Sequence, residues 1–287
     1  MACLAVIPRC SQPQEPVDGD VAMGTDSIAR LDIDSTGVSS GKTVIKGNST
    51  KSRSLLLWAT VATLALNFVP SQYSIVLLYP LRIFVTFFHE SGHAMAAILT
   101  GGHVDYLQVF SNGEGVTYGR PPFWALWLFD SGGYIGTTIS GAVLLQFASR
   151  SRWKLTLNGI GAYILVVTLL WAHNPIDNLF TLSAGVIMAA AMFAAAQFCS
   201  QAVSGFLVTF LAVQLCLNAL GDLRMLFAIT TATSGPIRDN DAAFMSQNYA
   251  LPPVFWAVTW AGISVVILAI SLRSYFRATA RQGPIAK

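Results

Sequence analysis

A succession of long apolar runs begins at Leu55 and continues almost to the carboxyl end of the chain. A helix needs about 20 predominantly apolar residues to cross the hydrocarbon core of a bilayer. Seven runs approach or exceed that length, and the first of them is short. We therefore expect six or seven membrane-spanning helices, near residues 55–70, 75–99, 123–148, 155–173, 178–199, 203–230 and 252–272.

The composition of the 287-residue chain agrees with this expectation. Hydrophobic residues make up 54% of the chain and charged residues 11%, whereas a soluble domain carries about 25% charged residues. Too little polar surface remains to cover a soluble particle of this size. The predicted fold class is an all-α polytopic membrane protein with a small membrane-proximal β-hairpin. It lies in a lipid bilayer, and the sequence does not identify which membrane.

Three regions follow from the same pattern. Residues 1–53 are rich in Ser, Thr, Gly, Asp and Pro, which predicts a disordered polar tail. Residues 54–273 form the membrane-embedded domain, and residues 274–287 form a basic carboxyl-terminal tail. The four cysteines lack the spacing of a disulfide framework or a cysteine metal site. The glycines of residues 37–43 have the wrong spacing for a phosphate-binding loop.

The basic residues do not indicate a single orientation. Lys51 and Arg53 place the amino terminus on the inner side, where membrane proteins carry most of their Lys and Arg. Seven spans would then place the basic residues of 150–154 and of the carboxyl-terminal tail outside, which the same rule disfavours. Because these charges lie at helix ends and form no single basic face, we expect no nucleic-acid partner.

Residues 103–120 predict a β-hairpin. Apolar and polar residues alternate over 103–110, and Asn112-Gly113 follows, a pair that favours a tight turn between two strands. An ordinary hairpin between two helices is one interpretation. Farther along the chain, Gly132, Gly136 and Ser140 are spaced by four and predict a close helix–helix contact.

One motif carries chemistry: His89-Glu90-Ser91-Gly92-His93, an H-E-x-x-H pattern. Residues four apart share one face of a helix, so both imidazoles can bind one cation. Zinc accepts imidazole nitrogen, and the glutamate next to the first histidine can act as general base. The motif lies inside an apolar run, where ionisable side chains are costly and usually functional. The structural alternative is a pair of hydrogen-bonded histidines beside a buried glutamate.

The sequence around this motif resembles the site-2 protease family of intramembrane zinc metalloproteases, in particular its peptidase M50B-like branch. The resemblance is carried by residues 79–94, Gly101-Gly102, residues 113–118 and residues 131–136. It implies a single zinc ion per chain, held by His89 and His93. It also implies that the β-hairpin presents the substrate as an added strand beside the zinc.

A catalytic zinc ion normally has three protein ligands. In the family the third is an aspartate on a later membrane helix, preceded by an asparagine. Asp222 lies within an apolar run and has Asn218 four residues before it, so the resemblance assigns Asp222 to zinc. Asp241 or an unanticipated residue is the alternative ligand. The other aspartates outside the tail and hairpin are less suited to bind zinc. Asp130 is better interpreted as a helix cap, and Asp177 and Asp239 as loop residues.

The predicted activity is hydrolysis of peptide bonds in or near transmembrane segments of membrane proteins. Glu90 would accept the proton of the attacking water, and Asn218 would donate a hydrogen bond to the substrate backbone or the developing oxyanion. Two alternatives remain from other classes: a non-catalytic membrane scaffold that keeps the fold, and a transporter of metal or solute. The sequence contains no internal repeat of the kind that transporters show, and it does not indicate an oligomeric state.

Overall fold

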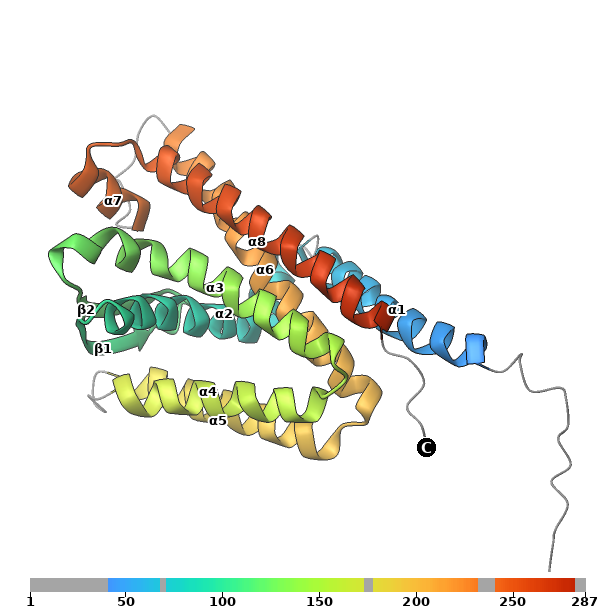
Figure 1. Ribbon diagram of the computed structural model, residues 1–287. Helices are drawn as coiled ribbons and strands as arrows, with labels where there is room; N and C mark the ends of the chain where they lie inside the picture. Colours follow the sequence, from blue (N-terminus) through green and yellow to red (C-terminus); the bar gives the residue numbers. More distant parts are fainter. Residues whose placement is uncertain (1–40, 68–70, 173–177, 232–240, 282–287) are drawn as a thin grey trace, which may run out of the picture. The chain divides into compact units, whose positions relative to one another are not determined.

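The computed structural model describes the backbone of residues 41–67, 71–172, 178–231 and 241–281. Side chains are described over the same ranges except for residues 41–52, 67, 71–77, 218–231 and 281. All described residues belong to one compact unit, residues 40–287. Figure 1 shows this unit as helices with one small two-stranded sheet.

Each of the seven predicted spans corresponds to a helix of the structure. These helices are α1 (Gly41–Asn67), α2 (Ser71–Leu99), α3 (Leu126–Ser149), α4 (Trp153–Trp171), α5 (Leu179–Phe198), α6 (Gln201–Thr231) and α8 (Pro253–Arg281). A short 3₁₀ turn, Phe123–Ala125, precedes α3. The helical assignment of the apolar runs is therefore confirmed.

The number of membrane spans is not confirmed at six or seven. Three helices within the described ranges are long and apolar enough to cross a membrane: Trp153–Trp171, Leu179–Phe198 and Pro253–Ala280. Two shorter apolar segments, Arg53–Leu66 and Gln201–Leu217, lie in α1 and α6. Helices α2 and α3 carry polar residues in their interiors, among them Arg82, Glu90 and Asp130, which lowers their hydropathy.

The predicted hairpin is present. Strand β1 (His103–Val109) pairs antiparallel with β2 (Gly115–Arg120), and the register shifts between Val104 and Tyr106. Gly113 adopts φ +82° in the connecting turn, a conformation that glycine reaches without strain. Thr181 of α5 accepts a hydrogen bond from the Val109 amide at 2.9 Å, which fixes β1 to that helix.

Helices α2 and α3 approach closely because glycines face each other across their contact. A Cβ atom on Gly132 would lie 2.8 Å from the carbonyl oxygen of Gly92. A Cβ atom on Gly136 would lie 2.9 Å from the Cα atom of Gly92. Only residues without a side chain allow backbones to approach so closely. The predicted contact through Gly132 and Gly136 is thus present, and it lies against the H-E-x-x-H helix.

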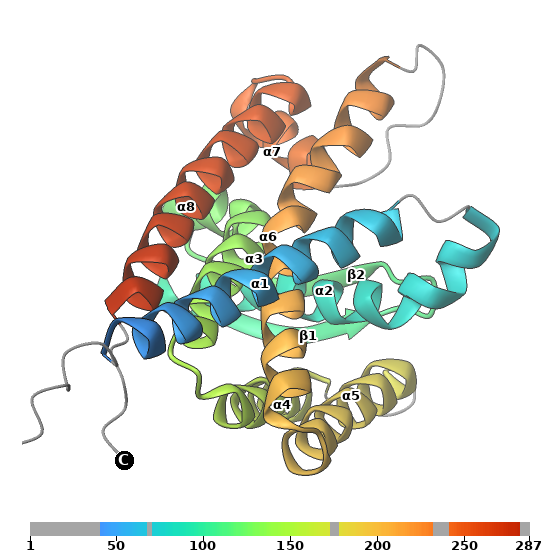
Figure 2. The same ribbon diagram turned by 90° about the vertical axis from the view of Figure 1, so that its right-hand side faces the viewer.

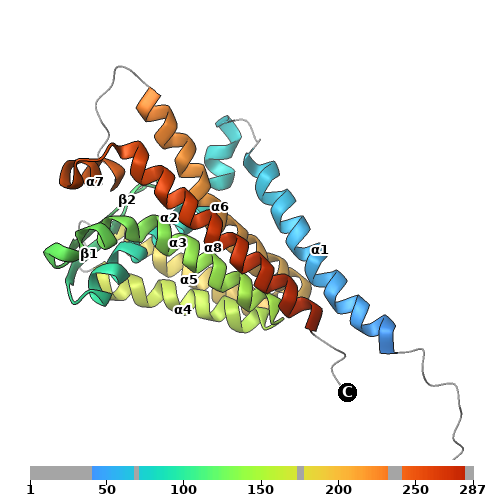
Figure 3. The ribbon, with the colours of Figure 1, turned by 45° about the horizontal axis from the view of Figure 1, so that its top comes forward.

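Helices α3 and α8 lie side by side and run parallel (Figure 3). Three hydrogen bonds occur in the same order along both helices: Trp260 Nε1 to Ser131 Oγ at 2.9 Å, Thr138 Oγ1 with Ser264 Oγ at 2.9 Å, and Gln146 Nε2 to the Ser271 carbonyl at 2.9 Å. Helix α6 packs against α1, α3, α4 and α8, and Figure 2 shows α1 crossing it. Its buried residues Val208 and Leu215 belong to the main apolar core.

Two helices extend past the predicted limits of the membrane-embedded domain. Helix α1 begins at Gly41, so residues 41–53 of the predicted disordered tail are helical; residues 1–40 lie outside the described part. Helix α8 continues to Arg281 and buries Tyr275, so residues 274–281 are helical. Each helix extends into a polar flank because lengthening an existing helix costs little free energy. Each added residue loses its backbone freedom but gains one hydrogen bond.

The loop predicted between the last two spans contains a further helix, α7 (Asp241–Tyr249). Ala242 and Met245 of α7 pack with Ala257 and Trp260 of α8 in a small apolar cluster. This cluster sets the position of α7 and, with it, of Asp241 at its first turn.

Candidate metal centre

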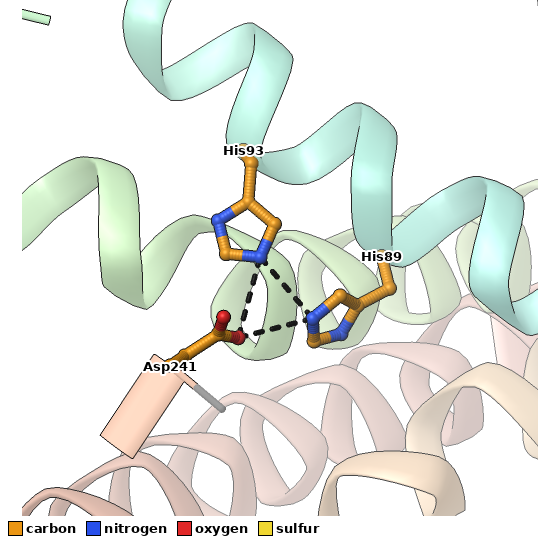
Figure 4. Close-up of side chains that lie close together, drawn as sticks. All are labelled: His89, His93 and Asp241. Carbon is orange, nitrogen blue, oxygen red and sulfur yellow. Dashed lines mark hydrogen bonds and ion pairs between the residues drawn. The ribbon is translucent and has the colours of Figure 1, made fainter. Parts of the chain in front are cut away.

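Helix α2 positions the two histidines of the motif. His89 and His93 are one helical turn apart, and their rings lie edge to face with centroids 4.9 Å apart. The third member of the cluster is Asp241, whose carboxylate lies at the start of α7, an end of a helix that favours negative charge. Figure 4 shows the three side chains converging from α2 and α7.

Three atoms of these side chains form a small triangle. His89 Nε2 lies 3.2 Å from Asp241 Oδ2, His93 Nε2 lies 3.3 Å from the same oxygen, and the two nitrogens are 3.2 Å apart. Ligand atoms of a tetrahedral zinc ion lie about 3.3–3.4 Å apart when each is 2.0–2.1 Å from the metal. The spacing and the donor set therefore fit a metal ion, and zinc accepts both kinds of ligand.

Gly133 of α3 leaves room for such an ion. A Cβ atom at this position would lie 2.5 Å from His89 Cε1 and 2.5 Å from His93 Nε2, and it would also meet His89 Nε2. Any side chain here would fill the space toward which both ring nitrogens point. The glycine is thus required by the site as well as by the packing of α2 on α3.

A backbone carbonyl fixes the tautomer of His93. Its Nδ1–H donates to the carbonyl oxygen of Phe129 at 2.6 Å, so the lone pair of the neutral ring is on Nε2, which faces Asp241. Metal-binding histidines commonly donate their second ring nitrogen in this way. Tyr134 packs edge to face on His89 with centroids 4.8 Å apart and stacks on Trp260 at 4.7 Å, which limits how His89 can turn.

Glu90 is buried and is held by the hairpin. Thr117 of β2 donates its hydroxyl to Glu90 Oε2 at 2.8 Å and also lies 2.9 Å from the Glu90 carbonyl oxygen. A Cβ atom on Gly115 would lie 2.6 Å from Glu90 Oε1, so this residue too must be small. Strand β2 therefore lies directly against the glutamate of the motif.

The hairpin turn is tied to the same helix. Tyr79 donates to the Ser111 carbonyl oxygen at 2.8 Å, and Thr86 donates to the Gly113 carbonyl oxygen at 2.8 Å. Together with Glu90, these residues form one stripe along α2 that contacts the hairpin. His89 and His93 lie beside this stripe on the same helix and face α3 and α7, so a single helix joins the strands to the candidate metal cluster of His89, His93 and Asp241.

The cluster is partly open. The side chains of Asp241 and His89 are 24% and 17% exposed, whereas that of His93 is 6% exposed. Burial by itself would raise the pKa of Asp241, but the charge of the imidazoles of His93 and His89 when they are protonated, and the hydrogen bonds that they then donate, outweigh it and lower the pKa below its ordinary value. An ionised carboxylate is the form that binds a cation.

The structure brings together three of the residues that the sequence singled out near the motif: His89, His93 and Asp241. The sequence offers Asp241 only as the alternative to Asp222 for the third ligand. Its signal in the sequence was weak, since Asp241-Ala-Ala-Phe-Met begins a helix of only nine residues. Thr117, Gly133 and the Phe129 carbonyl were not predicted, because their roles arise from contacts between distant elements.

Other candidate residues have different outcomes. The side chains of Asn218 and Asp222 lie outside the described residues, as do Asp177 and Asp239 as a whole, so Asn218 and Asp222 stay predictions. Asp130 is not a helix cap: α3 begins at Leu126, and the Asp130 Oδ2 atom is buried with no hydrogen-bond partner within the described part.

Comparison with known proteins assigns the family. A family model described as peptidase M50B-like matches residues 55–271, which is more than half of the chain. The chain belongs to the peptidase M50B-like family. No curated protein and no solved structure matches it.

The matched region contains every residue of the cluster and the whole hairpin. The resemblance to the site-2 protease family is thereby confirmed, and the peptidase M50B-like assignment supports a protease-like fold. Together with the three apolar helices, it supports a membrane protein. Residues 1–54 lie outside the family match.

Proposed function

We propose that this chain is a multi-pass intramembrane zinc metalloprotease that hydrolyses peptide bonds in or near transmembrane segments of membrane proteins. The observation that carries the proposal is the triangle of His89, His93 and Asp241, whose ligand atoms are spaced as around a tetrahedral metal. Family membership supports it, because the residues of the triangle lie within the matched region.

His89, His93 and Asp241 would hold one zinc ion and leave a fourth position open toward the exposed side of the cluster. A zinc ion bound there would supply an activated water and polarise the scissile carbonyl. We assign the third ligand to Asp241 in place of Asp222 because the Asp241 carboxylate already lies 3.2–3.3 Å from both ring nitrogens.

Glu90 would act as the general base. It would accept the proton of the attacking water and deliver it to the leaving amine. The hydroxyl of Thr117 orients the carboxyl through Oε2 and leaves Oε1 for the proton. Asn218 is the candidate donor to the substrate backbone or the oxyanion, as the resemblance implies.

The substrate would reach the site as an extended segment next to the hairpin. A helix within a membrane satisfies its own backbone groups, so it must unwind before its peptide bonds can be cleaved. A strand edge can pair with an unwound backbone, and β2 touches the general base through Thr117. Membrane-embedded protein segments are therefore the proposed substrate class.

The test uses the full chain reconstituted in vesicles with a reporter membrane protein. Zinc analysis should give one ion per wild-type chain and close to none for His89→Ala. Glu90→Gln should keep zinc, because Glu90 is not a ligand, and should lose hydrolysis by about 100-fold to 10,000-fold. Wild-type zinc content without cleavage of any membrane substrate would favour the scaffold. Near wild-type cleavage by Glu90→Gln would overturn the proposal.

A further inference from the structure

Basic residues gather at the end of the helices that lies away from the metal cluster. Because α3 and α8 run parallel, Arg150 at the end of α3 and Arg273 and Arg277 near the end of α8 lie at the same end. Arg53 of α1 joins them, since its guanidinium lies 5.9 Å from the centroid of the Phe276 ring. A count of seven spans would place Arg53 and the other basic residues on opposite sides of the membrane. In the structure they lie at the same end of the helices, so this conflict with the distribution of basic residues disappears.

An apolar crevice lies at this basic end. It has a volume of about 360 Å³ and lies between α1, α3, α6 and α8. Its walls are formed by residues such as Leu56, Leu145 and Leu268, and Arg53 and Phe276 also line it. Its apolar lining suits a hydrocarbon chain, and the Arg53 guanidinium in that lining suits an anion.

Arg53 at the crevice and the neighbouring arginines of α8 have no acidic partner in the described ranges. The carboxylates described in the structure are engaged elsewhere: Asp105 with Arg120, Glu114 with Asn112, and Glu90, Asp130 and Asp241 at or beside the metal cluster. No ion pair joins Arg53, Arg273 or Arg277 to any of them. Among the residues whose side chains are described, no carboxylate neutralises the positive charge at this end, which suits an external anion.

We propose that the crevice binds one anionic phospholipid, with an acyl chain between α1, α6 and α8 and the phosphate at Arg53. Transfer of an acyl chain from the bilayer into an apolar crevice gains little, because lipid tails are as apolar as the crevice walls. Charge must therefore decide which lipid occupies it. A cation near the surface favours anionic lipid by about fivefold.

The proposal is independent of proteolysis, since the crevice shares no residue with the metal cluster. The test measures lipid retained by the purified full chain in native mass spectrometry, after addition of phosphatidylglycerol or phosphatidylcholine with identical acyl chains. Wild type should retain one phosphatidylglycerol in preference to phosphatidylcholine. Arg53→Gln should reduce that preference by about fivefold.

Two variants separate the site from general charge effects. Thr60 lines the crevice, so Thr60→Phe should fill it and abolish retention while all cations remain. Arg152 is exposed and does not line it, so Arg152→Gln should bind lipid as wild type does. Equal retention of both lipids by wild type, or an equal loss in Arg152→Gln, would overturn the proposal.

In a final arm of the experiment, inorganic phosphate or glycerophosphate is added to the protein with its bound phospholipid, and displacement of the lipid is measured. Neither should displace the bound phospholipid at equimolar concentration, because they lack the acyl chain. Full displacement would show that the site recognises a free phosphate and would contradict a lipid site. Zinc content should be unchanged in each variant, which excludes unfolding as the cause of lost binding.

Discussion

Two helix pairs of this molecule are packed in the same way and do different things. In both, glycine allows one helix to approach another: Gly132 meets Gly92 between α2 and α3, and Gly185 meets Thr168 between α4 and α5. Over the part of the chain that the structure describes, α4 and α5 are long and apolar enough to span a membrane, whereas α2 and α3 are not among such helices. The difference is that α2 and α3 enclose polar groups.

This contrast explains why the most apolar helices are not the ones that carry the candidate site. The polar residues of the candidate site on α2, His89, Glu90 and His93, lower the apolar character of that helix. Those polar groups are tolerated because each has a partner, such as Phe129 or Thr117. Helix α5 supports the hairpin through Thr181.

The sharpest test of the contrast is Gly133→Ala in α3. The added methyl group would occupy the space between the two imidazole Nε2 atoms, so we expect zinc occupancy of the purified protein to fall close to zero. Gly159→Ala is the control, because a Cβ atom on this α4 glycine would have nothing within 4 Å. Full zinc content in Gly133→Ala would show that the metal does not bind where the imidazoles converge.

Replacement of the third ligand distinguishes two aspartates. Asp241→Ala should weaken zinc binding by more than the roughly 100-fold that loss of an outer partner can cause, measured by competition with a chelator. Asp222→Ala should leave zinc affinity unchanged. The reverse pattern would assign the ligand to Asp222, as the family resemblance predicted, and would make Asp241 a neighbour of the site.

The link between hairpin and general base is tested by Thr117→Val. The substitution preserves the shape of the side chain but removes the hydroxyl that donates to Glu90. Hydrolysis should fall about 10-fold to 100-fold while zinc content stays constant. Thr117→Ser keeps the hydroxyl and should remain near wild-type activity. A rate unchanged in Thr117→Val would separate the hairpin from the orientation of the base.

The smallest effect is expected in the apolar pair. Gly185→Ala would press a methyl group against Thr168 and should destabilise the protein by about 1–3 kcal/mol. The measurement is a lower thermal midpoint in detergent, with zinc content unchanged. Loss of zinc in this variant would mean that the α4–α5 pair and the metal cluster are not independent.

Much of the fold could be predicted because its signals are local. Each apolar run became a helix, and the Asn112-Gly113 pair did mark the turn of a hairpin. Periodicity and turn chemistry act within a few residues. The helix ends at Gly41 and Arg281 were missed because helices extend into polar flanks at little cost.

The candidate site was predicted only in part for the same reason. His89, Glu90 and His93 lie within five residues, so helix geometry alone relates them. Asp241 follows them by about 150 residues, and its position depends on how Met245 of α7 packs against Trp260 of α8. Packing of that kind leaves no periodic trace in the sequence.

The sequence by itself determined that this is a helical chain suited to a membrane, with an H-E-x-x-H motif and a hairpin after it. The tertiary structure decided which carboxylate meets the two imidazoles, why Gly133 must lack a side chain, and which hydroxyl holds Glu90. The physical reason is that helix and turn preferences are short-range, whereas a site assembled from α2, α3, α7 and β2 exists only when those elements pack together.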